Sequence, residues 1–497
     1  MDNYAKYLKN PVFGIFSEVA EQYGFKAFVI GGYVRDCFLG RSSDDIDVVV
    51  EGSGVDFANK VAARLEEIEY SQHKTRHKIN VSEFKTYGTA MIKYGGLELE
   101  FVGARKESYR KESRNPIVEN GSLTDDQLRR DFTINAMAFS LCKEDFGALV
   151  DPFGGFSDLE RGIIRTPQDP DITFSDDPLR MLRAVRFATK LSTPQLQFRI
   201  TPECMEAMRR NRNRLQILTR ERIAEELNKM LVVPKPSKAF RLMDEAGLLE
   251  LILPSLTALK GVNVMEGKGH KYNFDHTLQV LDNVAELEME SRPEPNVWLR
   301  WAALLHDVGK ARTRRYDPSV GWTFHGHEVV GGRMVPKISS SLKLPQNEKM
   351  DYVKKLVELH LRPIALVTEE VTDSAVRRLL FEAGDDIDDL MILCHGDITS
   401  KNLRKVERLH ANFELVQRKL VEVEEKDAIR NFKNPIDGDY IMKLFGIEPC
   451  RTIGELKEYV KEAILNGDIP NEFEAADARM RSRAAELGLV PENDTRE

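Results

Sequence analysis

Two aspartates and a glycine turn near the start of the chain have the spacing of a phosphoryl-transfer site. Asp45 and Asp47 alternate along a strand predicted over residues 45–50, so both carboxylates face one side. Two carboxylates at one place repel each other unless a cation lies between them, and Mg²⁺ prefers hard oxygen ligands. Gly31 and Gly32 end the preceding predicted strand, where backbone amides can approach a phosphate, and Arg35 follows within one helical turn. Together these residues predict a two-metal site that activates a hydroxyl and stabilises leaving pyrophosphate.

A third acidic residue and a cluster of histidines extend this chemistry. Glu100 ends the LELE stretch and is a candidate third ligand on the neighbouring strand. Seven of the ten histidines lie between residues 270 and 395, and LLHDVGK places a histidine and an aspartate side by side after an apolar helix. Imidazole and carboxylate groups suit transition metals or Mg²⁺, which acidify water that can attack a phosphoester. The expected participants are His276, His306, Asp307, His325, His327, His360 and Asp397.

The elements that must position these residues change in type along the chain. Residues 27–32, 45–50, 89–94 and 97–104 read as strands, with the Gly-Gly pair at 95–96 predicting a hairpin. From about residue 155 helical periodicity dominates, as in residues 177–191, 220–232 and 238–252. The glycine-rich stretch over 261–274 resembles a domain boundary. We therefore expect an α/β head over 1–155, a helical neck over 156–262, a helical histidine-rich domain over 263–400 and a helical tail over 401–497.

Composition sets the broad class. With 497 residues, 42% hydrophobic and 31% charged, the chain has the material for several globular domains. The net charge of −8 means that any nucleic-acid contact must come from local basic patches. One candidate is the run Arg209, Arg210, Arg212, Arg214, Arg220 and Arg222, which could equally be a solvated helix face. Five scattered cysteines and the lack of a membrane-spanning apolar stretch favour a reducing, cytoplasmic setting without a membrane anchor.

The first third of the chain resembles a known family. GGYVRD followed by DIDVVV is similar to the first motif of the bacterial-type (class II) CCA-adding enzymes and poly(A) polymerases, which share a polymerase-β-like nucleotidyltransferase fold. RRDFTINAMA, DPFGGFSDL, DDPLRMLRAVRF and RERIAEEL resemble its later motifs, in the family's order. The resemblance implies that Asp45 and Asp47 hold Mg²⁺. It also implies that the triphosphate, ribose and base are contacted by Gly31, Gly32, Arg35, Arg130, Asp131, Asn135, Asp177, Arg180, Arg183 and Arg186.

Base selection without a template has a simple explanation in Asp177 and Arg180, which lie at i and i+3 of a predicted helix. An ionised Asp only accepts hydrogen bonds and Arg only donates them. Cytosine and adenine both present an amino donor beside a ring-nitrogen acceptor, which matches this pair, whereas uracil and guanine do not. A solvated salt bridge is the alternative. The family usually has Glu before the base-reading Asp, and Asp176 in its place leaves that orienting role open.

The segment ARKESYRKESRNPIVENGSL, residues 104–123 between Glu100 and Arg129, has no apolar period and reads as a loop. It resembles the mobile loop that CCA-adding enzymes need for the final A, with Arg105, Glu107, Tyr109 and Arg114 as loose matches. A disordered surface loop is the alternative.

The histidine-rich segment resembles the HD phosphohydrolase superfamily. The resemblance implies that His276, His306, Asp307 and Asp397 are metal ligands, and that His327 and His360 hold a second ion. Lys310 could contact phosphate. The expected ion is Mg²⁺, Mn²⁺, Ni²⁺ or Co²⁺, although some relatives keep this domain without full activity.

These observations predict a tRNA nucleotidyltransferase that adds C, C and A from CTP and ATP to an RNA 3′ end, with an HD phosphohydrolase domain. The alternatives are a poly(A) polymerase or A-adding enzyme, an HD phosphohydrolase whose head only binds RNA, and an RNA-binding protein without chemistry. The oligomeric state is left open by the sequence.

Overall fold

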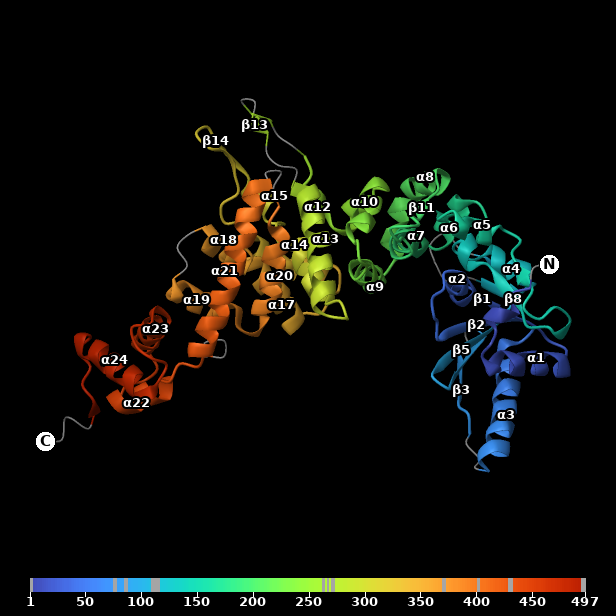
Figure 1. The fold of residues 1–497 in the computed structure, drawn as a ribbon, viewed down its shortest axis with the longest axis horizontal. Helices are drawn as coiled ribbons and strands as arrows, with labels where there is room; N and C mark the ends of the chain where they lie inside the picture. The colour runs from blue at the N-terminus through green and yellow to red at the C-terminus, as the bar shows by residue number, and fades with distance from the viewer. Residues whose placement is uncertain are drawn as a thin grey trace. The chain divides into compact units, whose positions relative to one another are not determined.

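The protein is described here by a computed structural model (Figure 1), which covers residues 3–74, 78–84, 88–108, 117–261, 264–265, 268–269, 273–368, 372–399, 403–427 and 432–492. The chain divides into two compact units. Unit 1 comprises Met1–Met230 with Lys238–Ile252, and unit 2 comprises Leu231–Ser237 with Leu253–Glu497. The finer division into four domains stays a prediction.

Unit 1 is built on a seven-stranded sheet in the order β3-β4-β5-β2-β1-β8-β9. The four predicted strands are confirmed as β1 (Lys26–Ile30), β2 (Asp45–Glu51), β4 (Thr89–Tyr94) and β5 (Leu97–Gly103). Gly95 and Gly96 close the β4–β5 hairpin with φ of 58° and 82°, values that glycine adopts without strain. The edge strands β3 (Val81–Phe84) and β9 (Leu149–Val150), and β8 (Ala138–Ser140) between β1 and β9, were not predicted, because they are short.

One face of this sheet packs against helices, and the other carries the acidic residues. On one face, α1 (Pro11–Tyr23) and α3 (Gly54–His73) pack against the strands. The ring of Phe101 lies 5.4 Å from Phe16 and 5.8 Å from Phe57, centroid to centroid, and all three are fully buried. Phe101 is paired with Val48 in the register of β5 and β2, so Val48 also faces these helices. The alternating residues of β2, including Asp45 and Asp47, therefore face the opposite side.

After the sheet, unit 1 is mainly helical, as predicted. Its helices include α6 (Pro170–Asp176), α7 (Leu179–Lys190), α8 (Pro202–Asn211), α9 (Arg220–Leu231) and α10 (Ser237–Glu245). Residues 238–252 form two helices rather than one, because Gly247 adopts φ +69° between α10 and α11 (Leu249–Ile252). The mixed α/β head followed by a largely helical remainder confirms the predicted fold class.

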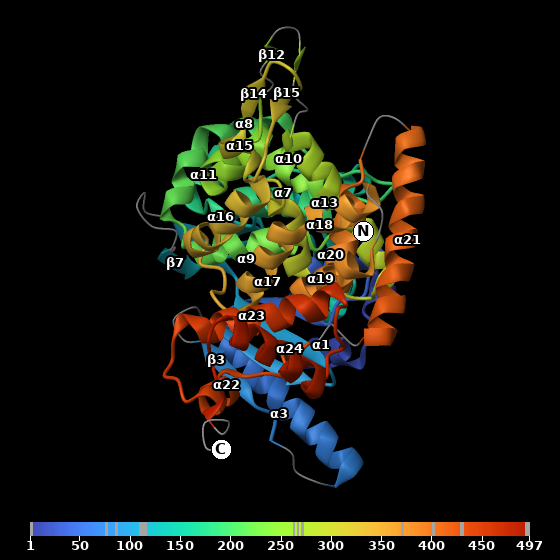
Figure 2. The same cartoon turned by 90° about the vertical axis from the view of Figure 1, so that its left-hand side faces the viewer.

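Unit 2 is a helical assembly around a buried core. Its central helices are α13 (Asn273–Ser291), α14 (Val297–Leu305), α16 (His327–Ser341), α17 (Glu348–Leu359) and α20 (Ile387–Asp397). The long α21 (Leu403–Asp427) packs along α18 (Leu361–Thr368) and α19 (Asp373–Ala383) (Figure 2). The charged tail continues as α22 (Gly438–Phe445), α23 (Arg451–Asn466) and α24 (Phe473–Glu486). Within the described ranges, every helix is too short or too polar to cross a bilayer.

Candidate active sites

The acidic site of unit 1 lies on two neighbouring parallel strands. The register of β2 and β5 places Asp47 beside Glu100 and Asp45 beside Glu98. Paired residues of parallel strands face the same side, so Asp45, Asp47 and Glu100 share one face of the sheet. The predicted third carboxylate is therefore adjacent to the first two, although it lies more than fifty residues further along the chain.

The electrostatics of these carboxylates match a site that needs a cation. Burial raises the pKa of Asp47, and the charge of Asp45 raises it further while Arg130 opposes the change. Burial also raises the pKa of Glu100, with Asp47 and Asp45 adding to the effect. The carboxylates destabilise one another's charged forms, and a divalent cation among these oxygens would relieve that cost. The residues present thus fit Mg²⁺.

The glycine turn lies directly against this site. Gly31 has φ +83°, and a Cβ added there would lie 3.2 Å from Asp47 Oδ2 and 3.1 Å from Arg130 Nη1. A side chain at residue 31 would therefore be strained and crowded. Gly32 begins α2 (Gly32–Phe38) with ordinary space around it, so the close approach depends on Gly31.

A chain of buried hydrogen bonds links the predicted nucleotide-binding residues. Arg35 Nη1 donates to Asn135 Oδ1 at 2.7 Å, and Asn135 Nδ2 donates to Asp131 Oδ1 at 3.0 Å. Arg183 Nε donates to the other oxygen of Asp131 at 2.7 Å. Burial alone would raise the pKa of Asp131, but Arg183 and Asn135 lower it to about 2. The carboxylate of Asp131 thus connects Arg183 to Asn135, which in turn binds Arg35 of the first motif.

Phe187 is a functional candidate that sequence reasoning missed. The guanidinium carbons of Arg35, Arg183 and Arg186 lie 5.1, 5.3 and 4.3 Å from the centroid of its ring. Stacking on an aromatic ring restrains a guanidinium without using its hydrogen-bond donors. The signal available in the sequence was an aromatic residue in the arginine-rich motif. Arg186 is additionally fixed by Glu226, which accepts a hydrogen bond from its Nε at 2.6 Å.

The expectation that Asp177 and Arg180 share one helix is wrong in detail. Helix α7 begins at Leu179, and Asp177 lies in the break after α6, with its Oδ1 accepting a hydrogen bond from the Leu179 amide. Pro178 ends the preceding helix because it disfavours helical backbone at Asp177. Arg180 Nη2 donates to the Arg129 carbonyl at 2.7 Å, whereas its buried Nη1 has no hydrogen-bond partner within the described residues. Such a buried donor is suited to bonding a ligand.

The two ends of the predicted loop are not irregular: they pair as the short antiparallel strands β6 (Arg105–Ser108) and β7 (Ile117–Asn120). Tyr109 and Arg114 lie outside the described residues. Arg105 Nε lies 2.9 Å from Glu107 Oε1, and Arg129 Nη1 donates to the same oxygen at 2.9 Å. The base of the hairpin is therefore tied to the motif that carries the nucleotide-binding residues.

Asp126 is a second residue that the sequence analysis missed. It is fully buried and accepts hydrogen bonds from Arg129 and from Arg130 Nε, the latter at 3.1 Å. Burial alone would raise its pKa, but these two arginines lower it. Asp126 thus orients Arg130, whose Nη1 lies near Gly31 and whose charge acts on Asp47.

All six predicted metal ligands of unit 2 meet at one place. Asp307 is central: its Oδ2 lies 3.5 Å from His276 Nε2 and 3.3 Å from His306 Nε2. Its Oδ1 lies 3.2 Å from His327 Nε2 and 3.9 Å from His360 Nε2. Asp397 Oδ1 lies 2.9 Å from His276 Nε2. Two overlapping groups of possible ligands, His276–His306–Asp307 and Asp307–His327–His360, thus share one carboxylate.

The hydrogen bonding and protonation of the clustered side chains fit a divalent metal ion. The Nε2 atoms of His306, His327 and His360 are buried and have no hydrogen-bond partner within the described residues. Burial lowers the pKa of His360 to about 4, so this ring is neutral at neutral pH, as a metal ligand must be. Lys310 Nζ donates to Asp307 Oδ2 at 2.6 Å, so its ammonium lies at the cluster.

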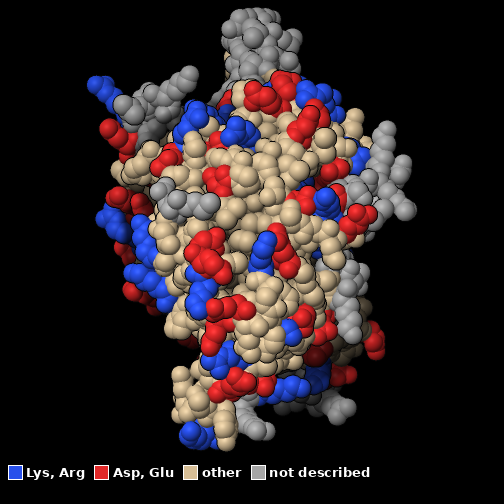
Figure 3. Space-filling view, turned by 90° about the vertical axis from the view of Figure 1, so that its right-hand side faces the viewer, with Lys and Arg blue, Asp and Glu red and all other residues tan. Residues whose placement is uncertain are grey.

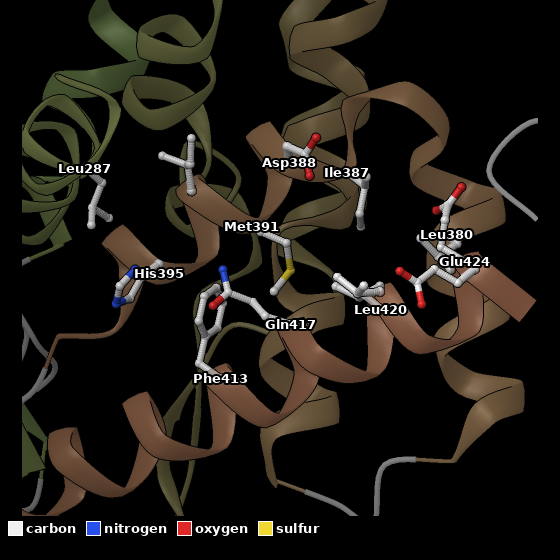
Figure 4. A pocket seen from close by; sticks show the side chains of 13 residues that line it. Leu287, Leu380, Ile387, Asp388, Met391, His395, Phe413, Gln417, Leu420 and Glu424 are labelled. Carbon is white, nitrogen blue, oxygen red and sulfur yellow. The ribbon is translucent and has the colours of Figure 1, made fainter. Parts of the chain in front are cut away.

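Two other histidines of the segment lie outside the cluster. His325 is exposed, which corrects its placement among the expected participants. His395 hydrogen bonds to His410 at 2.8 Å and stacks on Phe413. It lines a separate cavity of about 500 Å³ between α20 and α21, whose walls are mostly apolar (Figure 4).

The arginine run of unit 1 is partly neutralised. Arg209 pairs with Glu206 and Glu245, and Arg210 pairs with Asp171. On the face of the molecule shown in Figure 3, basic and acidic side chains are interspersed. The run is therefore less basic than its sequence alone suggests.

Three successive parts of the chain match known protein families. Residues 27–165 match the poly(A) polymerase head domain family, and residues 197–260 match the probable RNA- and SrmB-binding site of polymerase A. Residues 273–385 match the HD domain family.

Two relatives and one solved structure are similar over most of the chain. The A-adding tRNA nucleotidyltransferase of Deinococcus radiodurans is 32% identical, over 71% of this chain and 78% of its own length. The multifunctional CCA protein of Shewanella frigidimarina is 31% identical, over 76% of this chain and 84% of its own. A tRNA nucleotidyltransferase solved with a primer tRNA and an incoming ATP analog superposes with a TM-score of 0.57 at 25% identity, covering 82% of this chain and 99% of that one.

Proposed function

Because the chain belongs to the class II family of CCA-adding enzymes and poly(A) polymerases that carry an HD domain, we propose that it adds C, C and A from CTP and ATP to the 3′ end of tRNA. That the chain is a tRNA nucleotidyltransferase follows from its family. The observation that carries the proposed chemistry is the register of β2 and β5, which brings Asp45, Asp47 and Glu100 to one face beside the Gly31 turn.

The proposed reaction is attack of the RNA 3′-hydroxyl oxygen on the α-phosphorus of the nucleotide. The new P–O bond forms as the bond to pyrophosphate breaks, and a carboxylate of the acidic site accepts the hydroxyl proton. Mg²⁺ held by Asp45 and Asp47 would stabilise the charge that develops on the phosphate oxygens. Arg35 and Arg130 are cations close to this site and would bind the triphosphate.

Base choice is assigned to Asp177 and Arg180. Arg180 is anchored through Nη2 to the Arg129 carbonyl, while its buried Nη1 has no hydrogen-bond partner among the described residues and is available to a ligand. A cytosine or adenine would supply an acceptor to Arg180 and an amino group to Asp177. A uracil or guanine would leave buried polar groups unsatisfied, at a cost of about 1–3 kcal/mol for each.

Three tRNA substrates distinguish CCA addition from the alternatives. The tRNAs end before CCA, after the first C or after CC, and each is incubated with labelled CTP, ATP, UTP or GTP alone and then with CTP and ATP together. We expect CTP to extend the first two substrates, ATP to extend only the third, and growth to stop after one A. An enzyme that extends only the CC-ended tRNA with ATP is an A-adding enzyme, and continued A addition identifies a poly(A) polymerase.

A second activity is favoured by the geometry of the HD cluster. We infer that unit 2 hydrolyses phosphomonoesters or 2′,3′-cyclic phosphates, because Asp307 faces two separate pairs of histidines. A divalent ion held by these residues supplies the Lewis acidity that makes water an adequate nucleophile near neutral pH. The Lys310 ammonium, which lies at Asp307, would neutralise the phosphate.

The hydrolysis is tested with a chromogenic phosphomonoester, a chromogenic phosphodiester and a 2′,3′-cyclic nucleotide, each with Mg²⁺, Mn²⁺, Ni²⁺ or Co²⁺. We expect turnover with at least one ion, and its loss in Asp307→Ala. No turnover by the wild type with any of the four ions would contradict the proposed activity and leave a structural metal site as the explanation of the cluster.

A further inference from the structure

Three of the four clustered histidines are oriented by the same kind of hydrogen bond to the backbone. His306, His327 and His360 each direct Nδ1 at the carbonyl three residues earlier, with N···O distances of 2.8, 2.8 and 2.7 Å. Those carbonyls belong to Ala303, Phe324 and Val357. A ring that donates through Nδ1 keeps its proton there, so that Nε2 carries the lone pair that can bind a metal.

The positions of these histidines explain why the backbone can serve this purpose. His306 and His360 directly follow α14 and α17, and the last four carbonyls of a helix lack partners within it. His327 is the first residue of α16, and Phe324 precedes that helix. Ala303 and Val357 thus lie in the last turns of their helices, whereas Phe324 lies outside α16 and its carbonyl also accepts a hydrogen bond from the His327 amide at 3.2 Å.

The ring of His276 does not make the same backbone hydrogen bond. It is the fourth residue of α13, so the carbonyl three residues earlier, that of Asn273, is required by the ladder of α13 itself. Its Nδ1 lies instead 3.0 Å from the hydroxyl oxygen of Thr399, while its Nε2 lies 2.9 Å from Asp397 Oδ1. His276 is thus the one clustered histidine whose outer nitrogen is held by a side chain.

We propose that Thr399 is a positioning residue of the metal centre: its hydroxyl contacts Nδ1 of His276, and with the ion bound it would accept the Nδ1 proton, so that Nε2 presents its lone pair to the ion in place of its present contact with Asp397. The inference rests on the metal centre of the proposed phosphohydrolase. Thr399 follows Asp397 by two residues, so one short segment supplies both a ligand and the group that orients a second ligand.

Independent contacts hold this segment against α13. Asn283 Nδ2 donates to the Gly396 carbonyl at 2.9 Å. A Cβ at Gly396 would lie 2.7 Å from Val284 Cγ2, so only glycine allows this close approach of α20 to α13. The distance between Thr399 and His276 is therefore set by packing that a substitution at residue 399 leaves in place.

The experiment is a titration of the full-length protein with Co²⁺, followed by calorimetry and by the visible absorption of the bound ion. Co²⁺ is chosen because it favours imidazole ligands over the all-carboxylate site of unit 1. Thr399→Val removes the acceptor while keeping the shape of the side chain, and Thr399→Ser keeps the hydroxyl. Thr277→Val is the matched control, since Thr277 is a buried neighbour of His276 on α13 whose hydroxyl has no hydrogen-bond partner among the described residues.

We expect Thr399→Val to weaken Co²⁺ binding about 10- to 100-fold and to alter the Co²⁺ spectrum, as loss of a group that orients a metal ligand typically does. Thr399→Ser should restore the affinity to within a few-fold, and Thr277→Val should leave it unchanged. If Thr399→Val binds Co²⁺ with wild-type affinity, or if Thr399→Ser does not restore that affinity, the positioning role of Thr399 is overturned while the metal centre still stands. If the wild type binds no more Co²⁺ than His306→Ala does, the metal centre itself is overturned, and the positioning role of Thr399 with it.

Discussion

The buried carboxylate of Asp131 offers the sharpest test of how unit 1 builds its nucleotide site. Replacing it in Asp131→Asn keeps the shape of the side chain but removes the charge that holds Arg183, and disturbs the bond from Asn135. The gap between the folded pKa of about 2 and the ordinary 3.8 corresponds to about 2 kcal/mol of folding free energy. We expect unit 1 to lose about this much stability in the variant at neutral pH.

The sign of the pH dependence follows from the lowered pKa. A carboxyl whose pKa is lower in the folded state stabilises the fold above its unfolded pKa, and this contribution disappears as pH falls through the folded pKa. The difference in stability between wild type and Asp131→Asn should therefore be complete at pH 5–7, and shrink between about pH 4 and pH 2.

Urea denaturation can follow the two units separately. All three tryptophans, at residues 298, 301 and 322, belong to unit 2, so their fluorescence reports unit 2 while far-ultraviolet circular dichroism reports both. We expect the unit 1 transition of Asp131→Asn to move by roughly 1 M urea and the fluorescence transition to stay in place. CTP and ATP incorporation should fall together by about 100-fold, because Arg183 and Asn135 lose their shared anchor.

The matched control is Asp171→Asn, which removes the exposed partner of Arg210 and should change neither stability nor incorporation appreciably. If Asp131→Asn is no less stable than this control at pH 7, the reasoning from burial and ion pairing at Asp131 is refuted.

Four further outcomes are expected. Asp45→Ala and Asp47→Ala should each abolish CTP and ATP incorporation with an unchanged circular dichroism spectrum, and full activity in either would exclude the two-metal assignment. Asp177→Ala should impair C and A addition alike and relax the exclusion of UTP, so normal CTP addition with UTP still excluded would place base selection elsewhere. Deleting residues 109–116 should spare CC addition but impair the terminal A, whereas equal loss of both would give the loop a structural role. His306→Ala should remove phosphoester hydrolysis while nucleotide addition stays within a few-fold, and loss of both would show that the two units depend on each other.

Much of the site chemistry could be predicted from the sequence, because it depends on local periodicity. The alternation of Asp45 and Asp47 is a property of any strand, so their shared face needed no tertiary information. The same holds for the β4–β5 hairpin, whose Gly-Gly turn lies between two apolar segments. For the HD cluster, residue types together with the resemblance to the HD superfamily named the six ligands that meet at one place, although the residue types alone also suggested His325, which lies outside.

The residues that orient those side chains could not be found in this way. Asp126, Phe187 and Thr399 are common residue types without a characteristic spacing, and they act through contacts between segments far apart in the sequence. The error over Asp177 is one of helix bounds, since the predicted helix began at residue 177 whereas α7 begins at Leu179 and Asp177 lies in the break after α6.

The sequence by itself therefore determined which groups are the candidates for the chemistry, because nucleophile activation and metal binding demand particular residue types in local patterns. Only the tertiary structure decided how those groups are held. It placed Glu100 beside Asp47 through strand register, joined Arg35 to Arg183 through Asn135 and Asp131, and brought Thr399 to His276. The physical reason is that hydrogen bonding and burial depend on distance in space, which short-range sequence patterns do not encode.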